Sequence, residues 1–184
     1  MRVPLAKALS IFVIVGLAKA GFAQMPDLDA GPEVKKLDWL IGDWTATSTW
    51  TMEGMDPMEV EIEYSAKWDG KFISQSTVTD FVFFKMTETM LLGWDPDKKR
   101  YSSWAFTNMS SMPRIEHGSL EGDTLTMISE PWLVDGMDES SSSKAVLTKK
   151  GDDQMAFTLY LKVGDEDWAE TGKATFKRKK AEQK

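Results

Sequence analysis

The chain has 184 residues, of which 42% are hydrophobic and 28% charged, with a formal net charge of −7, one histidine and no cysteine. This length suits one ordinary domain. Without cysteine there are no disulfides, thiolate metal sites or thiol nucleophiles, and one histidine leaves few designs for a metal site or catalytic triad. The acidic balance argues against nucleic acid and anionic membrane as partners, because phosphate binding depends on clustered Lys and Arg.

Residues 1–23 have the pattern of a cleaved secretory signal peptide. Residues 8–18 form an apolar stretch too short to span a bilayer, and the small residues Gly21 and Ala23 suit cleavage before Gln24. The signal holds three bases and no acids, so the mature chain of 161 residues would carry 19 bases and 29 acids, a net charge of −10. We therefore expect a bacterial protein that is exported, periplasmic or secreted. The alternative is an uncleaved N-terminal anchor.

The mature chain is expected to hold a flexible leader at 24–31, one domain at 32–180 and a tail at 181–184. Within residues 32–41, apolar residues recur at helical spacing, a proline suits the first turn, and Gly42 suits the end of a helix. The sequence therefore predicts one short N-terminal helix.

From residue 43 onward the apolar residues alternate. Residues 59–68 read EVEIEYSAKW, which places five apolar side chains on one face and charges or hydroxyls on the other, as in a half-buried antiparallel strand. Further strands are predicted at 43–52, 71–80, 86–94, 100–107, 113–120, 123–130, 143–150, 154–163 and 167–178.

Short turns rich in Asp, Gly and Pro separate these strands and leave no room for parallel crossovers. An antiparallel meander must protect its two edges, and closure into a barrel removes them. We therefore predict an all-β fold, an antiparallel up-and-down β-barrel of about ten strands with one short N-terminal helix. The polar, Ser-rich residues 135–143 are expected to form a loop at one rim.

Two motifs resemble a known superfamily. Residues 37–44 read LDWLIGDW and place Gly-x-Trp between the helix and the first strand, which resembles the calycin superfamily of lipocalin-like and nitrobindin-like barrels. The chain is most similar to a bacterial family of uncharacterised exported proteins with a mid-chain Gly-[Tyr/Trp]-Asp-Pro hairpin and a closing basic strand. Here the hairpin motif comprises Gly93, Asp95 and Pro96, and the resemblance covers about 37–180.

The resemblance implies structural roles for these motifs. In calycins the glycine, here Gly42, lets the helix turn into the first strand, the tryptophan, here Trp44, plugs the barrel floor, and a base from the last strand lies over it. Strand parity assigns that base to Arg178. Nitrobindin-like relatives bind haem through a histidine near the C-terminus, whereas His117 lies mid-chain beside acids, so we expect no cofactor.

The expected barrel interior is rich in aromatic and methionine side chains, which suits a flat or flexible apolar ligand. A barrel of eight strands is just wide enough to be filled by its side chains, whereas about ten strands leave room for a cavity, so hollow and filled interiors both remain open. The residues predicted to line a ligand site are Trp50, Trp68, Met90, Trp104 and Phe106.

A second hypothesis concerns soft metal ions. Met52, Met55 and Met58 repeat Met-x-x-Met in a predicted hairpin loop, and thioethers suit Cu(I). The alternative is that Met58 simply begins a strand and that the spacing arose by chance.

These patterns together predict a small-molecule-binding barrel for an apolar or amphipathic ligand, without catalysis, nucleic acid or a membrane span after cleavage. A filled envelope module with a structural or protein-binding role is the alternative from another class. An enzyme that works through a pair of inward carboxylates is a third, although the sequence does not identify the pair. Glu88 and Glu170 lie among alternating apolar residues, and inward positions as polar anchors and solvent-facing positions both remain open for them. The ligand and the oligomeric state are left open.

Overall fold

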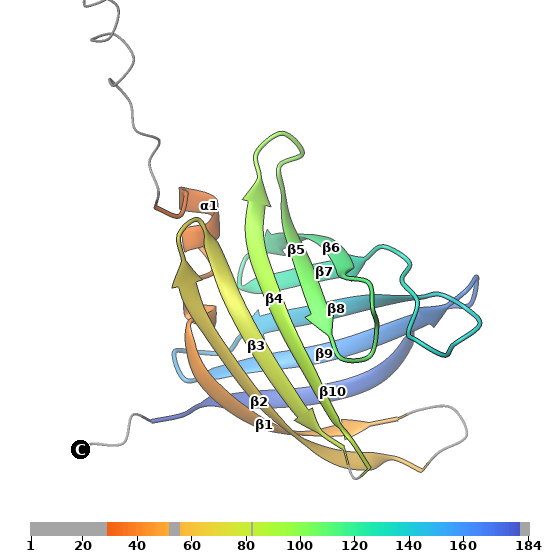
Figure 1. Cartoon of the computed structure of the whole chain (residues 1–184). Helices are drawn as coiled ribbons and strands as arrows, with labels where there is room; N and C mark the ends of the chain where they lie inside the picture. The colour runs from red at the N-terminus through yellow and green to blue at the C-terminus, as the bar shows by residue number, and fades with distance from the viewer. Residues whose placement is uncertain (1–28, 52–55, 82, 181–184) are drawn as a thin grey trace, which may run out of the picture.

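The computed structural model describes residues 29–51, 56–81 and 83–180, and these form one closed barrel (Figure 1). The expected signal peptide and most of the expected leader lie outside these residues. Ala30 is buried, so the packed domain already includes this residue.

Ten antiparallel strands follow one another around the barrel, and the first pairs with the last. The ten-stranded antiparallel barrel predicted from the sequence is confirmed. The strands are β1 (Gly42–Trp50), β2 (Met58–Asp69), β3 (Phe72–Asp80), β4 (Lys85–Asp95), β5 (Arg100–Thr107), β6 (Arg114–Glu121), β7 (Thr124–Ser129), β8 (Ser141–Lys149), β9 (Gln154–Val163) and β10 (Ala169–Arg178).

The predicted helix is two short helices. The α-helix α1 (Pro32–Lys35) ends at its cap Lys36, and a 3₁₀ helix, η1 (Asp38–Leu40), follows. Val34 of α1, Leu40 of η1 and Leu37 between the two helices are all buried in the core.

The two helices cover one end of the barrel, which we call the helix end (Figure 1). Leu37, Leu40, Trp44 and Tyr101 are almost fully buried there. The Tyr101 hydroxyl donates a hydrogen bond of 2.8 Å to the backbone carbonyl of Glu33, which joins β5 to α1. Side chains therefore fill the helix end.

The opposite end, which we call the mouth, is formed by the described parts of the connections 51–57, 81–84, 108–113, 130–140 and 164–168. The expected rim loop at 135–143 is shorter than predicted, because residues 141–143 begin β8 and pair with β9. Trp132 forms an isolated bridge with Ser141, which holds the connection 130–140 against the start of β8. Within the described residues no helix has the length and apolar character needed to cross a membrane.

Candidate functional site

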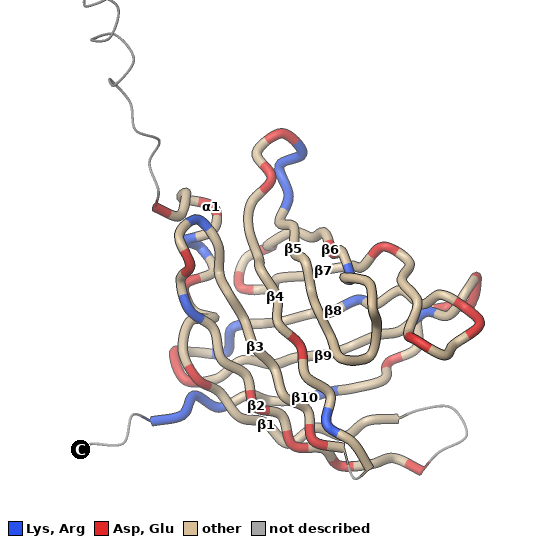
Figure 2. Tube along the Cα trace, viewed as in Figure 1, with Lys and Arg blue, Asp and Glu red and all other residues tan. Residues whose placement is uncertain are grey.

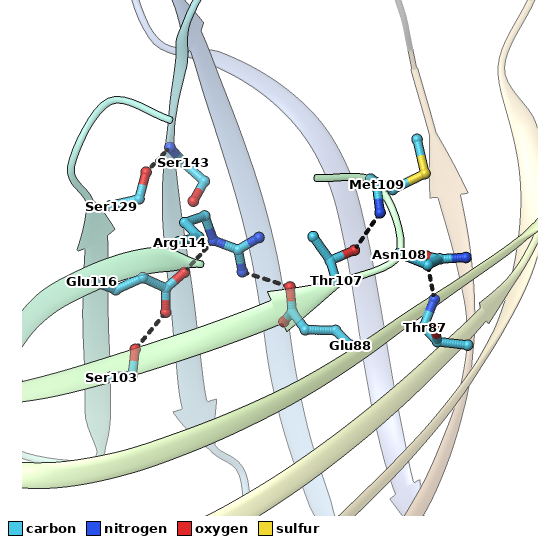
Figure 3. Close-up of polar contacts among 10 residues, drawn as sticks. All are labelled: Thr87, Glu88, Ser103, Thr107, Asn108, Met109, Arg114, Glu116, Ser129 and Ser143. Atoms are coloured by element: carbon cyan, nitrogen blue, oxygen red, sulfur yellow. Dashed lines mark hydrogen bonds and ion pairs between the residues drawn. The ribbon is translucent and has the colours of Figure 1, made fainter. Parts of the chain in front are cut away.

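A polar cluster lies on the inner wall near the mouth. The Arg114 guanidinium contacts two carboxylates, with 2.8 Å from Nη2 to Glu88 Oε2 and 2.8 Å from Nε to Glu116 Oε1. The Ser103 hydroxyl donates to the other oxygen of Glu116 at 2.8 Å. Figure 3 shows these side chains converging from three neighbouring strands. We call Glu88, Ser103, Arg114 and Glu116 the inner polar cluster.

Strand register builds this cluster. Ser103 of β5 lies opposite Glu116 of β6, which in turn lies opposite Ser129 of β7. The Ser129 hydroxyl accepts a hydrogen bond of 2.7 Å from the backbone N–H of Ser143 in β8. Because alternate residues of a strand share one face, Arg114 lies beside Glu116 on the inner wall. A continuous polar belt therefore crosses four strands on the inner wall of the barrel.

The cluster is buried enough to change how its members titrate. Arg114, Glu88 and Glu116 expose only 13%, 14% and 4% of their side chains. Burial raises the pKa of the Glu88 carboxyl, which Arg114 opposes and Glu116 reinforces. Burial alone lowers the pKa of Arg114, but the Glu88 and Glu116 carboxylates raise it above its ordinary value. Arg114 is therefore a permanent cation that holds two acids.

Several buried polar atoms of the interior have no hydrogen-bond partner among the described residues. They include the Ser143 hydroxyl, the Tyr64 hydroxyl and the indole nitrogens of Trp50 and Trp132. The Arg114 guanidinium lies 5.2 Å from the centre of the Trp132 ring, and Figure 3 shows the Ser143 hydroxyl turned toward Arg114. An unpaired buried polar group costs about 1–3 kcal/mol, so these atoms are suited to meet solvent or a ligand.

Apolar side chains of β4, β8 and β9 line the inner wall without being sealed. Met86, Trp94, Leu147, Phe157 and Leu159 pack against the core and yet keep some of their surface accessible. Met90 shares the face of Met86 on β4, pairs with the buried Ala105 and is also partly exposed. Of these residues, Met86, Met90 and Leu159 lie in the half of the barrel toward the mouth.

The other residues predicted to line a ligand site are placed differently. Trp50 is buried at the mouth end of β1, where its ring packs edge-to-face with Phe81 at 5.2 Å. Trp68 shares the inward face of β2 but lies at the helix end, where 39% of it is exposed. Trp68 is therefore remote from the inner polar cluster.

The inward assignment of Trp104 and Phe106 is wrong. Both lie on the outer face of β5, exposed by 40% and 55%, while Tyr101, Ser103 and Ala105 face the interior. The bulkier apolar residues of 100–107 lie on the outer face, so alternation alone selected the wrong face. Ser103 and Ala105, which are smaller than Trp104 and Phe106, face the interior, where space for side chains is limited.

The structural motifs lie at the helix end. Gly42 has φ +125°, a conformation that favours glycine, and a Cβ there would overlap the Arg178 guanidinium. The structure places that guanidinium 4.0 Å from the centre of the Trp44 ring, over which strand parity predicted it. These residues fix the joint between the helices and the closing strands.

The Gly-x-Asp-Pro motif shapes the turn between β4 and β5, which contains Pro96. The Asp95 carboxylate accepts hydrogen bonds of 3.1 Å from the backbone N–H groups of Asp97 and Lys98. A side chain at Gly93 would meet the ring of Phe72. The motif therefore has a local structural explanation.

The structure offers no haem ligand of the expected kind. His117 lies on the outer face of β6, where its ring contacts Arg100, Ser102 and Glu130 at 3.0–3.1 Å. The single histidine therefore does not face the interior, and the residues present do not fit histidine ligation of haem there. Within the described ranges, no group of three or more His, Cys, Asp or Glu residues is arranged to hold a metal.

Of the methionines in the copper hypothesis, Met52 and Met55 lie outside the described residues. Met58 is the first residue of β2 and packs against the core. Of the two candidate carboxylates, Glu88 faces inward, whereas Glu170 is exposed and pairs with Lys173 at 3.0 Å.

The inner polar cluster was missed as a unit in the sequence. Arg114 and Glu116 resemble the charged face of an ordinary edge strand, since Ile115 and His117 alternate with them. The one signal was the pair of opposite charges two residues apart. Only the register with Ser103 and Ser129 shows that this charged face points inward.

A shallow groove also crosses the outer face of β1, β2 and β10, with a volume of about 720 Å³. Its lining is mostly Thr, Lys and Glu, including Thr47, Glu61 and Lys173. It contains no part of the inner polar cluster.

The fold and its interior define a closed, ten-stranded antiparallel barrel with a buried polar cluster near one mouth. The chain belongs to the family described as protein of unknown function (DUF1579), whose model matches residues 29–178.

Two solved structures are similar to this chain. Rv2717c from M. tuberculosis is 18% identical with a TM-score of 0.66, and the match covers 83% of this chain and 100% of that chain. The S-type phycobiliprotein lyase CPES from Guillardia theta is 12% identical with a TM-score of 0.57, covering 80% of this chain and 93% of that chain. At these identities the likeness concerns the fold alone. No protein with a curated description matches the sequence.

Proposed function

We propose that this protein is an exported barrel that binds an apolar or amphipathic small molecule in its interior, without catalysis. The apolar part of the ligand lies along β4 and β9 near Met90 and Leu159, and its polar part meets the inner polar cluster. The observation that carries this proposal is the combination of inward apolar side chains that stay accessible and buried polar atoms that lack a protein partner. Ligand sites commonly combine an apolar wall with a few convergent polar groups.

The similarity in fold to a phycobiliprotein lyase supports a barrel that handles a small molecule, as an analogy. Export rests on the signal-peptide pattern of residues 1–23. Mass spectrometry of the protein from its own host tests it: cleavage predicts a mature chain that begins at Gln24, and an intact Met1 contradicts it.

A neutral fluorophore, N-phenyl-1-naphthylamine, tests interior binding. We expect saturable binding with enhanced emission, strongly weakened by Met90→Trp, which fills the proposed cavity. The matched control is Phe106→Ala on the outer face, which leaves binding unchanged. Loss of binding in Phe106→Ala together with full binding in Met90→Trp would place the ligand on the outer wall and contradict the proposal.

The alternative of a filled structural module has support at the helix end, where Leu37, Leu40, Trp44 and Tyr101 leave little surface accessible. If the protein is such a filled module, we expect no saturable binding of the fluorophore. Native mass spectrometry of the protein purified from its host separates the two functions, because a bound ligand adds its own mass.

A further inference from the structure

The inner polar cluster carries one more acid than base. Glu88 and Glu116 share the single guanidinium of Arg114, and Ser103, the other member, is uncharged. The carboxylate of Glu116 is fully engaged, because Arg114 takes one oxygen and Ser103 takes the other. Glu88 uses Oε2 for Arg114, and Figure 3 draws no hydrogen bond or ion pair from its other oxygen to the residues shown. A buried carboxylate that shares one guanidinium with a second carboxylate is a site for a hydrogen-bond donor or a cation.

A second, independent feature points to a ligand at this place. The Ser143 side chain is 96% buried, because the residue exposes only 4% of its surface, and its hydroxyl has no partner among the described residues. Ser143 follows Ser129 along the polar belt, and Figure 3 shows its hydroxyl turned toward the cluster. This hydroxyl can accept a hydrogen bond from a donor that lies between β4 and β8.

The mouth that leads to the cluster is acidic. The connection between β7 and β8 carries Asp135, Asp138 and Glu139, and the connection between β9 and β10 contains residues 165–167, which read DED. The backbone N–H of Gly164 donates a hydrogen bond of 3.1 Å to the carbonyl of Ser140, so these two connections lie side by side. Figure 2 shows their acidic residues gathered along this rim.

The described parts of all five mouth connections contain no Lys or Arg. At the helix end, by contrast, acids and bases are mixed, as in the turn between β4 and β5, where Lys98 and Lys99 follow Asp97 (Figure 2). A cleft lined by charge of one sign raises the local concentration of oppositely charged molecules. The mouth therefore attracts cations and repels anions.

We propose that the ligand is a cationic amphiphile, an apolar body that ends in a protonated amine. The amine lies against Glu88 Oε1 and donates to the Ser143 hydroxyl, while the apolar body extends along the inner wall past Met90. The acidic rim draws this cation to the mouth, and the surplus carboxylate holds it inside. This inference rests on the proposed function, because it assigns the chemical class of the interior ligand.

Three probes with the same ten-carbon body test the class: decylamine, 1-decanol and decanoate, each titrated against protein-bound N-phenyl-1-naphthylamine. A hydrogen bond to a charged group contributes about 1.5–3 kcal/mol. We therefore expect decylamine to displace the fluorophore at a concentration at least about tenfold below that of 1-decanol. Decanoate should be the weakest of the three.

The decisive variant is Glu88→Gln, which keeps the shape of the side chain and removes its charge. We expect Glu88→Gln to lose the preference for decylamine over 1-decanol, while its circular-dichroism spectrum and its cooperative unfolding transition show that it is folded. The matched control is Glu170→Gln, an exposed acid on β10, which retains the preference. A preference that survives in Glu88→Gln overturns the proposal.

The outcomes separate the class from the function. If the fluorophore binds and decanoate or 1-decanol competes as well as decylamine, the cationic class is wrong and the binding function stands. If the fluorophore itself does not bind, the proposed function fails. A second series with a flat body, 1-naphthylmethylamine, 1-naphthalenemethanol and 1-naphthoate, covers a cavity too short for a decyl chain. A bound fluorophore that neither amine displaces overturns the proposal.

Discussion

Arg178, near the C-terminal end of the described chain, lies 4.0 Å from the centre of the Trp44 ring, close to the start of the first strand. Its guanidinium also donates to the backbone carbonyls of Ile41 and Trp39, the latter at 3.2 Å. The Trp44 indole nitrogen donates to the carbonyl of Leu40 at 3.0 Å. The Arg178 guanidinium therefore binds backbone carbonyls at the end of η1 and also packs against Trp44 at the helix end of the barrel.

Replacing this cation tests the role of the helix end. We expect Arg178→Ala to lower the free energy of unfolding by about 2–4 kcal/mol, because it removes a cation–π contact and the charged donors to the carbonyls of Trp39, Ile41 and Asp152. Arg178→Lys should restore only part of the loss, since an ammonium cannot reach all three carbonyls at once. Urea denaturation measures the effect, with the neighbouring exposed Lys177→Ala as control. Equal stability of wild type and Arg178→Ala would remove this role.

Gly118 predicts a second stability effect. A Cβ at this position would overlap the backbone carbonyl oxygen of Thr126 on the neighbouring strand, so an alanine can fit only if β6 and β7 move apart. We expect Gly118→Ala to destabilise the barrel by about 1–3 kcal/mol or more. The control is Gly31→Ala, where a Cβ would meet nothing within 4 Å, with a loss below about 1 kcal/mol. Thermal unfolding compares the two variants.

Removing only the cation of the inner polar cluster should lower the free energy of unfolding more than removing the cation together with one of its two acids. Arg114→Ala leaves two carboxylates buried without their cation, and loss of one partner from a buried ion pair costs about 3–5 kcal/mol. We expect the double variant Arg114→Ala/Glu88→Gln to be more stable than Arg114→Ala alone, because it removes one of the stranded charges. Denaturant unfolding at neutral pH checks the order. A double variant that is less stable than the single one would show that the charges are not coupled.

Alkaline pH should weaken the contact between β5 and α1. Burial raises the pKa of Tyr101 to about 12, and the nearby Glu33 adds to the shift. A group whose pKa is raised by folding adds stability below its unfolded pKa of about 10, and this stability is lost as the pH rises through about 12. We therefore expect stability to fall between pH 10 and 12, and less steeply in Tyr101→Phe. Denaturation curves at several pH values measure both slopes.

Strand positions were predictable because most strands bury one face and expose the other. In β2, Val60, Ile62 and Tyr64 are buried while the intervening glutamates are exposed, so the alternation in the sequence is the alternation in space. The same rule gave the wrong face for β5, where Trp104 and Phe106 are bulkier than the Ser103 and Ala105 that point inward. Hydrophobicity favoured the wrong face of β5, because the inward residues include Ser103 and Ala105 whereas the outward ones include Trp104 and Phe106.

The candidate site was not predictable from local pattern. Glu88 drew attention because it interrupts apolar neighbours, but Arg114 belongs to a segment that reads as an ordinary exposed strand. Its partners are 26 and two residues away in the sequence, and the pairing of β4 and β6 with β5 between them brings the more distant one, Glu88, to the guanidinium. Side-chain facing in a barrel depends on the register of neighbouring strands, which a single strand does not encode.

The pairing of β1 with β10 has a consequence for how the chain acquires its fold. Trp44 and Arg178 are register partners, so the seam of the barrel joins residues from opposite ends of the domain. A nascent chain that lacks β10 would have two open strand edges and would leave Trp44 without Arg178. Long-range contacts of this kind slow folding, because the chain loses the entropy of loop closure before the contact stabilises it. Assembly of the native barrel therefore waits for its last ten residues, and a chain truncated before Ala169 should persist as an open, aggregation-prone sheet.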